Sequence, residues 1–199
     1  MTPNEGRMRP RTRAAAVGIG VPPAQLGTWI FLATVTMLFA AFCSAYVIRR
    51  AGADWTPIAL PLVLWLNTGL LVASSLTLEA ARAAGRRDGA TGARGWMLAT
   101  TGLGLLFLVG QVVAWRQLVT QGIYVPTSPH SAFFYIFTGL HGLHLAGGIA
   151  FLLYLSARLT RGGPEGAGPG GSRLITPCAT YWHFLGALWI LLFLVLSTI

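Results

Sequence analysis

The chain has 199 residues, of which 54% are hydrophobic and only 10% are charged. This composition leaves too little polar surface for a soluble globule of that length and indicates an integral membrane protein. The net charge of +9 reflects fourteen basic residues, all of them arginine, and they lie between the apolar segments. Arginines in these positions set the orientation of the protein in the membrane. The sequence contains no basic patch with interleaved aromatic residues, so it gives no indication of a nucleic-acid partner.

The first 21 residues are predicted to form a flexible basic tail in the cytoplasm. This segment holds four arginines among Pro and Gly and has nothing to bury. The uncharged segment at about residues 26–48 follows. At about 1.5 Å per residue, a helix of this length crosses a hydrocarbon core of about 30 Å. It is therefore the first predicted membrane span.

Four further uncharged segments predict the remaining spans, at about residues 57–78, 95–115, 133–157 and 177–198. Pro57 and Pro61 are expected in the first turns of the second span, where a helix tolerates proline. The Gly- and Pro-rich segment 162–173 is expected to be a mobile loop.

The sequence thus predicts an all-α fold, in which residues 22–199 form a single membrane domain built as a bundle of five transmembrane helices. Its orientation follows from the arginines. If the N-terminus is cytoplasmic, eleven of the fourteen lie on the cytoplasmic side. Because positive residues favour that side, we expect the N-terminus inside and the C-terminus outside.

A few polar or reactive side chains lie within or next to the spans. Asn67 and Ser74 are expected to hydrogen-bond across helices, with ligand binding as the alternative. Glu79 lies at a span boundary beside an arginine-rich loop, so it is interpreted first as a carboxylate paired with Arg and alternatively as a proton-handling group. Cys43 and Cys178 are interpreted as packing residues. No charged residue lies inside a predicted span, which argues against a transporter or proton channel.

The fourth span carries two histidines, His141 and His144, which lie on one helix face about one turn apart. Two ligands on the same face of one helix cannot supply both axial positions of a haem. A cross-helix pair of His144 with His183 remains open and would make the chain a self-contained b-type cytochrome. The alternative is a neutral imidazole hydrogen-bonded to a neighbouring helix. Small residues at four-residue intervals also predict a close helix contact, at Thr138, Gly142, Ala146 and Ala150.

Two motifs, TGLHGLH at 138–144 and YWHF at 181–184, occur together with the apolar segments LGTWIFLATVTMLFAAFCSAYVIRR at 26–50 and LPLVLWLNTGLLVASSLTLEAAR at 60–82. In this combination the chain resembles subunit III of the haem-copper respiratory oxidases, in the short five-helix form of that family. The resemblance covers all five predicted spans.

The resemblance implies a non-catalytic subunit III of a bacterial aa3- or caa3-like cytochrome c oxidase in the cell (inner) membrane. Such a subunit binds no redox cofactor itself. Its main partner would be the catalytic subunit I, which holds haem and copper, with subunit II and subunit IV as further partners. It would bind phospholipid in a cleft between its first two helices and the other three, and support proton uptake and turnover stability in aerobic respiration. The same fold in a quinol oxidase or as a nitric-oxide-reductase accessory protein remains the alternative.

The resemblance also marks seven positions as candidates for lipid binding or structure: Trp29, Phe31, Trp65, His141, His144, Trp182 and His183. Two positions depart from the family pattern. Val35 stands where many members have a membrane-embedded Glu, and Gly186 where many have an Asp. A structural and lipid-organising role therefore gains weight over any role that needs those carboxylates. Surface proton collection is then a hypothesis for Glu79 alone.

Overall fold

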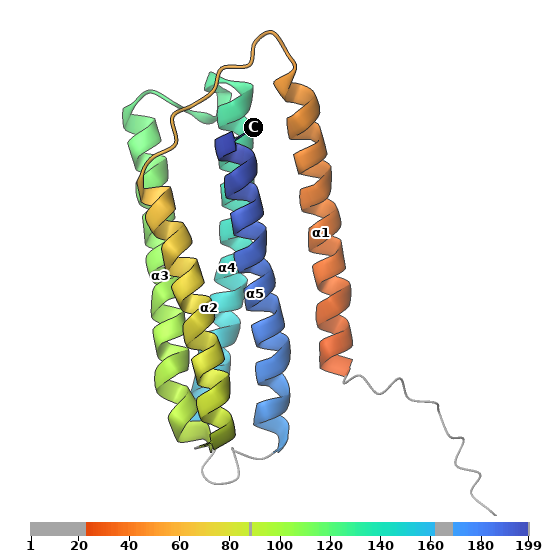
Figure 1. Ribbon diagram of the computed structural model, residues 1–199, viewed down its shortest axis with the longest axis vertical. Coiled ribbons are helices and arrows are strands. Elements are labelled where there is room, and N and C mark those ends of the chain that lie inside the picture. Colours follow the sequence, from red (N-terminus) through yellow and green to blue (C-terminus); the bar gives the residue numbers. More distant parts are fainter. Residues whose placement is uncertain (1–22, 88, 162–168, 199) are drawn as a thin grey trace, which may run out of the picture.

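The computed structural model describes residues 23–87, 89–161 and 169–198 (Figure 1). Within them lie five long helices and one short 3-10 helix, in this order: α1 (Pro23–Arg50), α2 (Val63–Arg87), α3 (Gly89–Thr120), η1 (Val125–Thr127), α4 (Pro129–Arg161) and α5 (Pro169–Thr198). Each of the five long helices is long and apolar enough to cross a membrane. The predicted all-α class with five transmembrane helices is confirmed. The predicted tail and residues 162–168 of the predicted loop lie outside the described residues.

Two helix boundaries differ from those expected in ways that proline explains. α2 begins at Val63, so Pro57 and Pro61 precede the helix and do not lie in its first turns. Proline lacks an N–H and disfavours helical backbone in the residue before it, which explains why the chain stays non-helical until both prolines have passed. α5 begins at Pro169, so residues 169–173 are helical where a loop was predicted. Proline suits the first position of a helix, because the N–H missing there would have no partner within the helix.

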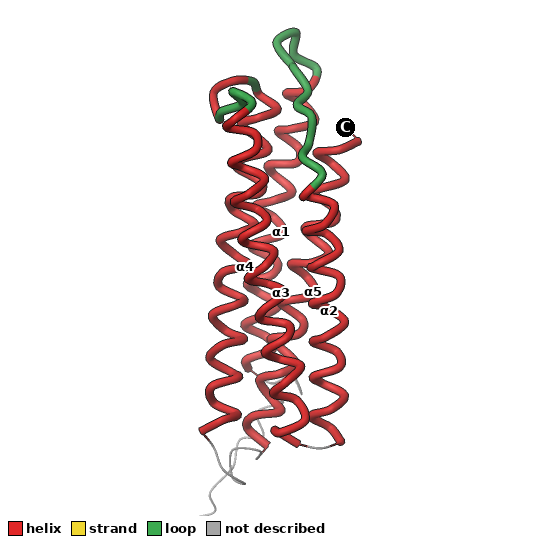
Figure 2. Tube along the Cα trace, turned by 90° about the vertical axis from the view of Figure 1, so that its left-hand side faces the viewer, coloured by secondary structure: helices red, strands yellow, loops and turns green. Residues whose placement is uncertain are grey.

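α2 to α5 form an antiparallel four-helix bundle, and α1 stands beside it (Figures 1 and 2). We call the end with loops 51–62 and 121–128 the Asp54 end, and the end with the α2–α3 junction the Glu79 end. α2 packs on α3 and α5, and α4 packs on α3 and α5, whereas α1 contacts only α4 and α5 among the described residues. The expected division was two helices against three. The observed division is α1 against the other four, and no contact joins α1 to α2 in the described part of the chain.

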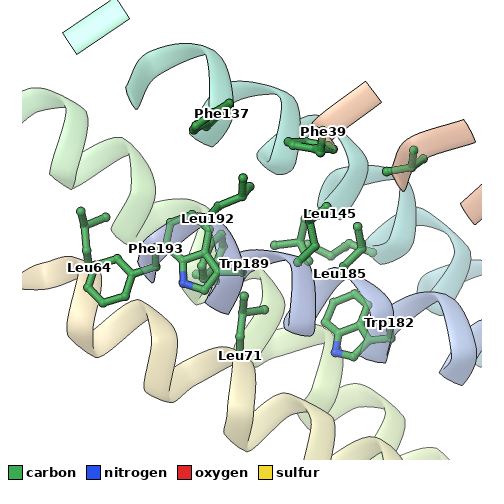
Figure 3. Packing of buried hydrophobic residues seen from close by; sticks show 14 of the residues in the cluster. Phe39, Leu64, Leu71, Phe137, Leu145, Trp182, Leu185, Trp189, Leu192 and Phe193 are labelled. Carbon is green, nitrogen blue, oxygen red and sulfur yellow. The ribbon is translucent and has the colours of Figure 1, made fainter. Parts of the chain in front are cut away.

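One face of α5 fills the centre of the four-helix bundle (Figure 3). Its buried side chains alternate at spacings of three and four residues, at Trp182, Leu185, Trp189, Leu192 and Leu196. This spacing keeps all of them on one side of the helix. The Trp182 indole fits because glycines face it: a Cβ at Gly104 of α3 would lie 2.7 Å from Trp182 Cη2, and one at Gly148 of α4 would lie 3.3 Å from Trp182 Cε3.

The small-residue stripe predicted on α4 is not the surface of closest approach. Ala146 and Ala150 are exposed among the described residues. The close contact lies at Gly148 instead, where a Cβ would meet the rings of Tyr181 and Trp182. Of the predicted stripe, Thr138 is buried and accepts a hydrogen bond from Trp115 of α3, so this end of the stripe meets a neighbouring helix. A spacing of four identifies a helix face without showing which part of that face meets a neighbour.

Candidate functional site

The seven predicted site residues do not form one site. Trp182 and His141 are buried inside the four-helix bundle. Trp29 and Trp65 lie on the outer surface, where the two residues are 53% and 62% exposed. Phe31, His144 and His183 lie between these extremes, at two different contacts between helices. The candidate residues therefore belong to several separate contacts.

His141 lies in the bundle core between α3 and α5. Its ring centroid is 5.7 Å from that of Phe107 and 5.1 Å from that of Trp189. The side chain has no exposed surface, and neither ring nitrogen has a hydrogen-bond partner among the described residues. His141 was predicted to have either a lipid-binding or a structural role. Its position inside the bundle favours the structural role, because lipid does not reach it.

His144 faces α1, although it lies only three residues from His141. A separation of three residues turns a helix about 60° short of a full turn, which is enough to direct the two rings to different neighbours. The ring centroid of His144 lies 6.2 Å from Phe31 and 5.9 Å from Phe39. Its Nδ1 lies 2.7 Å from the Leu140 carbonyl oxygen. A carbonyl can only accept, so this contact is a hydrogen bond in the His144 tautomer that carries its proton on Nδ1.

The same contact includes Tyr181 of α5. Its hydroxyl donates to the His144 carbonyl oxygen at 2.8 Å, and its ring lies 5.9 Å from Phe31. We call Phe31, Phe39, His144 and Tyr181 the α1 anchor, because they join α1 to α4 and α5. Phe39 and Tyr181 were missed by sequence reasoning. The eight-residue spacing of Phe31 and Phe39, which places both on one helix face, could have indicated the first.

His183 lies on the other side of α5 from the α1 anchor. Its Nε2 is 2.8 Å from Glu79 Oε1 of α2, and the same oxygen accepts from Arg82 at 2.7 Å. The predicted pairing of Glu79 with an arginine is thus present. The structure does not bring His144 and His183 together, because one ring faces α1 and the other α2. The described residues also contain no group of three or more His, Cys, Asp or Glu that could hold a metal ion.

The two positions that depart from the family pattern are both buried. Val35 is 2% exposed and belongs to the hydrophobic core. Gly186 faces α2, where a Cβ would lie 3.5 Å from Ser75 Oγ. Both positions contribute to packing between helices without a charged side chain.

Two apolar grooves flank α1. One has a volume of about 480 Å³ and lies between α1 and α5, with Phe39 and Cys43 on one wall and Leu188 on the other. The second has a volume of about 590 Å³ and lies between α1 and α4 near the Asp54 end, with Arg49 at its rim. Both grooves exist because α1 contacts the bundle along one narrow stripe, which leaves open space on each side of that stripe.

Trp65 lines a third pocket, of about 360 Å³, at the Asp54 end. Its ring meets Phe193 edge to face at 4.8 Å, and His130 and Trp55 form another wall. Trp55 stacks on His130 with 5.1 Å between ring centroids. Of these rings Trp65 is the exposed one, and an exposed indole near a helix end suits the membrane interface.

Comparison with known proteins gives a consistent result. The family model of cytochrome c oxidase subunit III matches residues 11–198. The chain is 34% identical over 176 residues to the probable cytochrome c oxidase subunit 3 of Mycobacterium tuberculosis, covering 86% of this chain and 85% of that protein. It is 31% identical over 175 residues to cytochrome c oxidase subunit 3 of Thermostichus vulcanus, with 86% and 85% covered.

These relatives are bacterial, and all five long helices of this chain can span a membrane. The protein is therefore a multi-pass protein of a bacterial membrane and part of a respiratory oxidoreductase complex. The match extends over all five helices and includes both histidine motifs. The chain belongs to the cytochrome c oxidase subunit III family of the haem-copper oxidases.

Proposed function

We propose that this chain is the non-catalytic subunit III of an aa3- or caa3-like cytochrome c oxidase and packs against the catalytic subunit I. Haem and copper then belong to the partner subunits, among them subunit II, with subunit IV as a further neighbour. The observation that supports a packing role is the outer face of α1. Its large side chains Ile30, Met37 and Ile48 are 62%, 74% and 73% exposed, and the bundle covers only one side of this helix.

We also propose that this subunit organises phospholipid. The grooves on the two sides of α1 are apolar and open toward the surrounding bilayer, so acyl chains in them would support α1 where the bundle does not. Trp29 and Trp65 are the exposed indoles among the candidates for lipid contact. Under the predicted orientation, the Glu79 end lies in the cytoplasm and the Asp54 end outside.

The test is affinity purification through a tag on this chain from its native membrane, followed by a reduced-minus-oxidised spectrum and mass spectrometry. We expect a haem-containing subunit I and a subunit II to co-purify in fixed ratio. A dinuclear copper centre or attached haem c in subunit II would identify cytochrome c as donor, and its absence would favour a quinol oxidase. A chain that arrives alone and without haem would refute the proposal, and one that arrives alone with a Soret band would establish the b-type cytochrome.

A second proposal concerns proton collection by Glu79. The supporting observation is that its carboxylate shares a hydrogen bond with His183, a second titratable group, at the arginine-rich Glu79 end. We expect Glu79→Gln, which keeps the shape but not the charge, to slow proton uptake by the purified oxidase severalfold. Asp54→Asn is the matched control at the opposite end and should leave the rate unchanged. Equal proton-uptake kinetics in Glu79→Gln and the unaltered oxidase would disprove the proposal.

A further inference from the structure

A layer of polar side chains crosses the interior of the α2–α5 bundle. Asn67 of α2, Gln111 of α3 and His141 of α4 are 1%, 2% and 0% exposed. Five of their polar atoms have no hydrogen-bond partner among the described residues: Asn67 Oδ1, both amide atoms of Gln111 and both ring nitrogens of His141. Roughly nine in ten buried polar groups in proteins are hydrogen-bonded, so five unpaired atoms on α2, α3 and α4 need a physical cause.

The side chain of Asn67 reaches α3 at the level of Gln111. Its Nδ2 lies 3.4 Å from the Phe107 carbonyl oxygen. Its Oδ1 fills the space beside Gly110, because a Cβ on that glycine would lie 2.1 Å away. Gln111 follows Gly110 directly and lies one helical turn after Phe107, so it shares the Phe107 face of α3.

His141 lies at the same level on α4. The antiparallel helices α3 and α4 are aligned by Trp115, whose Nε1 donates to Thr138 Oγ1 at 3.0 Å. About one turn from this bond, Gln111 on α3 and His141 on α4 face the same interface. The Phe107 ring, which lies 5.7 Å from the His141 ring, also belongs to this level.

We propose that Asn67, Gln111 and His141 together bind a buried water molecule. Water can donate to Asn67 Oδ1 and to an unprotonated imidazole nitrogen while it accepts from the Gln111 amide. A buried water typically makes about three hydrogen bonds, so one molecule satisfies three of the five atoms, one on each of the three side chains. These side chains include no carboxylate, so the layer suits a neutral ligand better than a cation. This proposal does not depend on the oxidase assignment.

The two neighbouring polar contacts of the bundle are direct and provide a contrast. Trp182 Nε1 donates to Ser74 Oγ at 3.0 Å, and Trp189 Nε1 donates to Thr68 Oγ1 at 3.0 Å. Each of these bonds satisfies its indole without a third molecule. The layer of Asn67, Gln111 and His141 differs from these two contacts, because its side chains do not pair with each other and a water molecule can join them.

The first test is a density map of the intact complex at a resolution that shows ordered water. We expect a peak at hydrogen-bond distance, roughly 2.6–3.2 Å, from at least two of the three side chains. A map in which the Gln111 amide bonds directly to His141, with no density between the helices, would overturn the proposal.

The second test measures the thermal midpoint at which this chain unfolds in the complex, for Asn67→Leu, Gln111→Leu, His141→Phe and the triple variant. Each single change leaves the other groups short of a partner, so we expect each to lower the midpoint by several degrees. The triple variant should lower it by clearly less than the sum, because no polar group is left unpaired. Strictly additive shifts would contradict a shared water. Gln111→Met, close in shape, replaces Gln111→Leu if the latter does not accumulate.

Discussion

α1 and α5 are apolar helices of similar length, yet the fold uses them in different ways. In the most apolar segment of α1, 22% of the residues are buried, against 44% in α5. α5 places Trp182 and Trp189 among three other helices, and each indole is fixed by a hydrogen bond. α1 is held along one stripe of buried residues: Leu32, Val35, Phe39 and Tyr46. Because lipid is as apolar as leucine, shape complementarity decides which helix becomes central, and hydrophobicity does not.

Replacement of Trp182 should have the largest effect on this contrast. Trp182→Ala removes an indole that is 1% exposed, opens a cavity between Gly104 and Gly148, and leaves Ser74 without its donor. We expect a loss of about 3–5 kcal/mol in the free energy of unfolding. The measurement is thermal or denaturant unfolding of the purified protein. Trp29→Ala, on the exposed face of α1, is the matched control and should change stability by less than about 0.5 kcal/mol. Equal losses in both variants would remove the distinction between the two helices.

Replacement of Phe39 should have a smaller and more local effect. Phe39 is 1% exposed but lines the groove beside α1, so lipid can enter the space left by Phe39→Ala. We expect a clearly smaller cost than for Trp182→Ala, because acyl chains can replace the lost van der Waals contacts and no apolar surface moves between lipid and water. The two native cysteines report on the two regions, because Cys43 lies on α1 and Cys178 is buried in α5. A membrane-permeant thiol reagent should label Cys43 faster in this variant and Cys178 at the unchanged rate. Faster labelling of both would show that α1 and the bundle unfold together.

The smallest expected effect lies at the end of α1, where Arg49 forms an exposed ion pair with Asp54. The hydrogen bond from Arg49 holds the pKa of the Asp54 carboxyl below its ordinary value. A carboxyl whose pKa is lower in the folded state contributes stability above its ordinary pKa and loses it as the pH falls through the folded value. Asp54→Asn should therefore slightly increase Cys43 labelling at neutral pH, and the difference should shrink below about pH 4. A difference that persists in stronger acid would indicate another cause.

The sequence was sufficient to predict the number and order of the helices, because each crosses the membrane as an uncharged segment between arginines. It also placed the chain in the correct family from the motifs around His141 and His183. The division of roles within those motifs was not predictable. His141 and His144 differ by about 60° around α4, and only the positions of α1 and α3 determine that one ring enters the core and the other meets Phe31.

The partners of Glu79 illustrate the same limit at the helix ends. Arg82 is three residues away, so helical spacing alone predicts it. His183 belongs to another helix far along the chain, and its approach to Glu79 depends on how α2 and α5 pack. The boundary of α2 was misplaced for a different reason. Pro57 and Pro61 were interpreted as the first turns of the helix, but both lie in non-helical backbone before α2 begins at Val63.

The isolation of α1 has a consequence for how the protein is made. α1 is synthesised before the other four long helices described here, but its contacts are with α4 and α5, which begin at Pro129 and Pro169. At about 5–20 residues per second, α1 waits on the order of ten seconds in the bilayer before its first partner helix emerges from the ribosome. Its segment is the most apolar of the five, which lets it insert alone, whereas the least apolar segment, in α2, is followed at once by its partner α3. For α1 and α2, the time each helix spends without a partner thus matches its ability to remain in the membrane unaided.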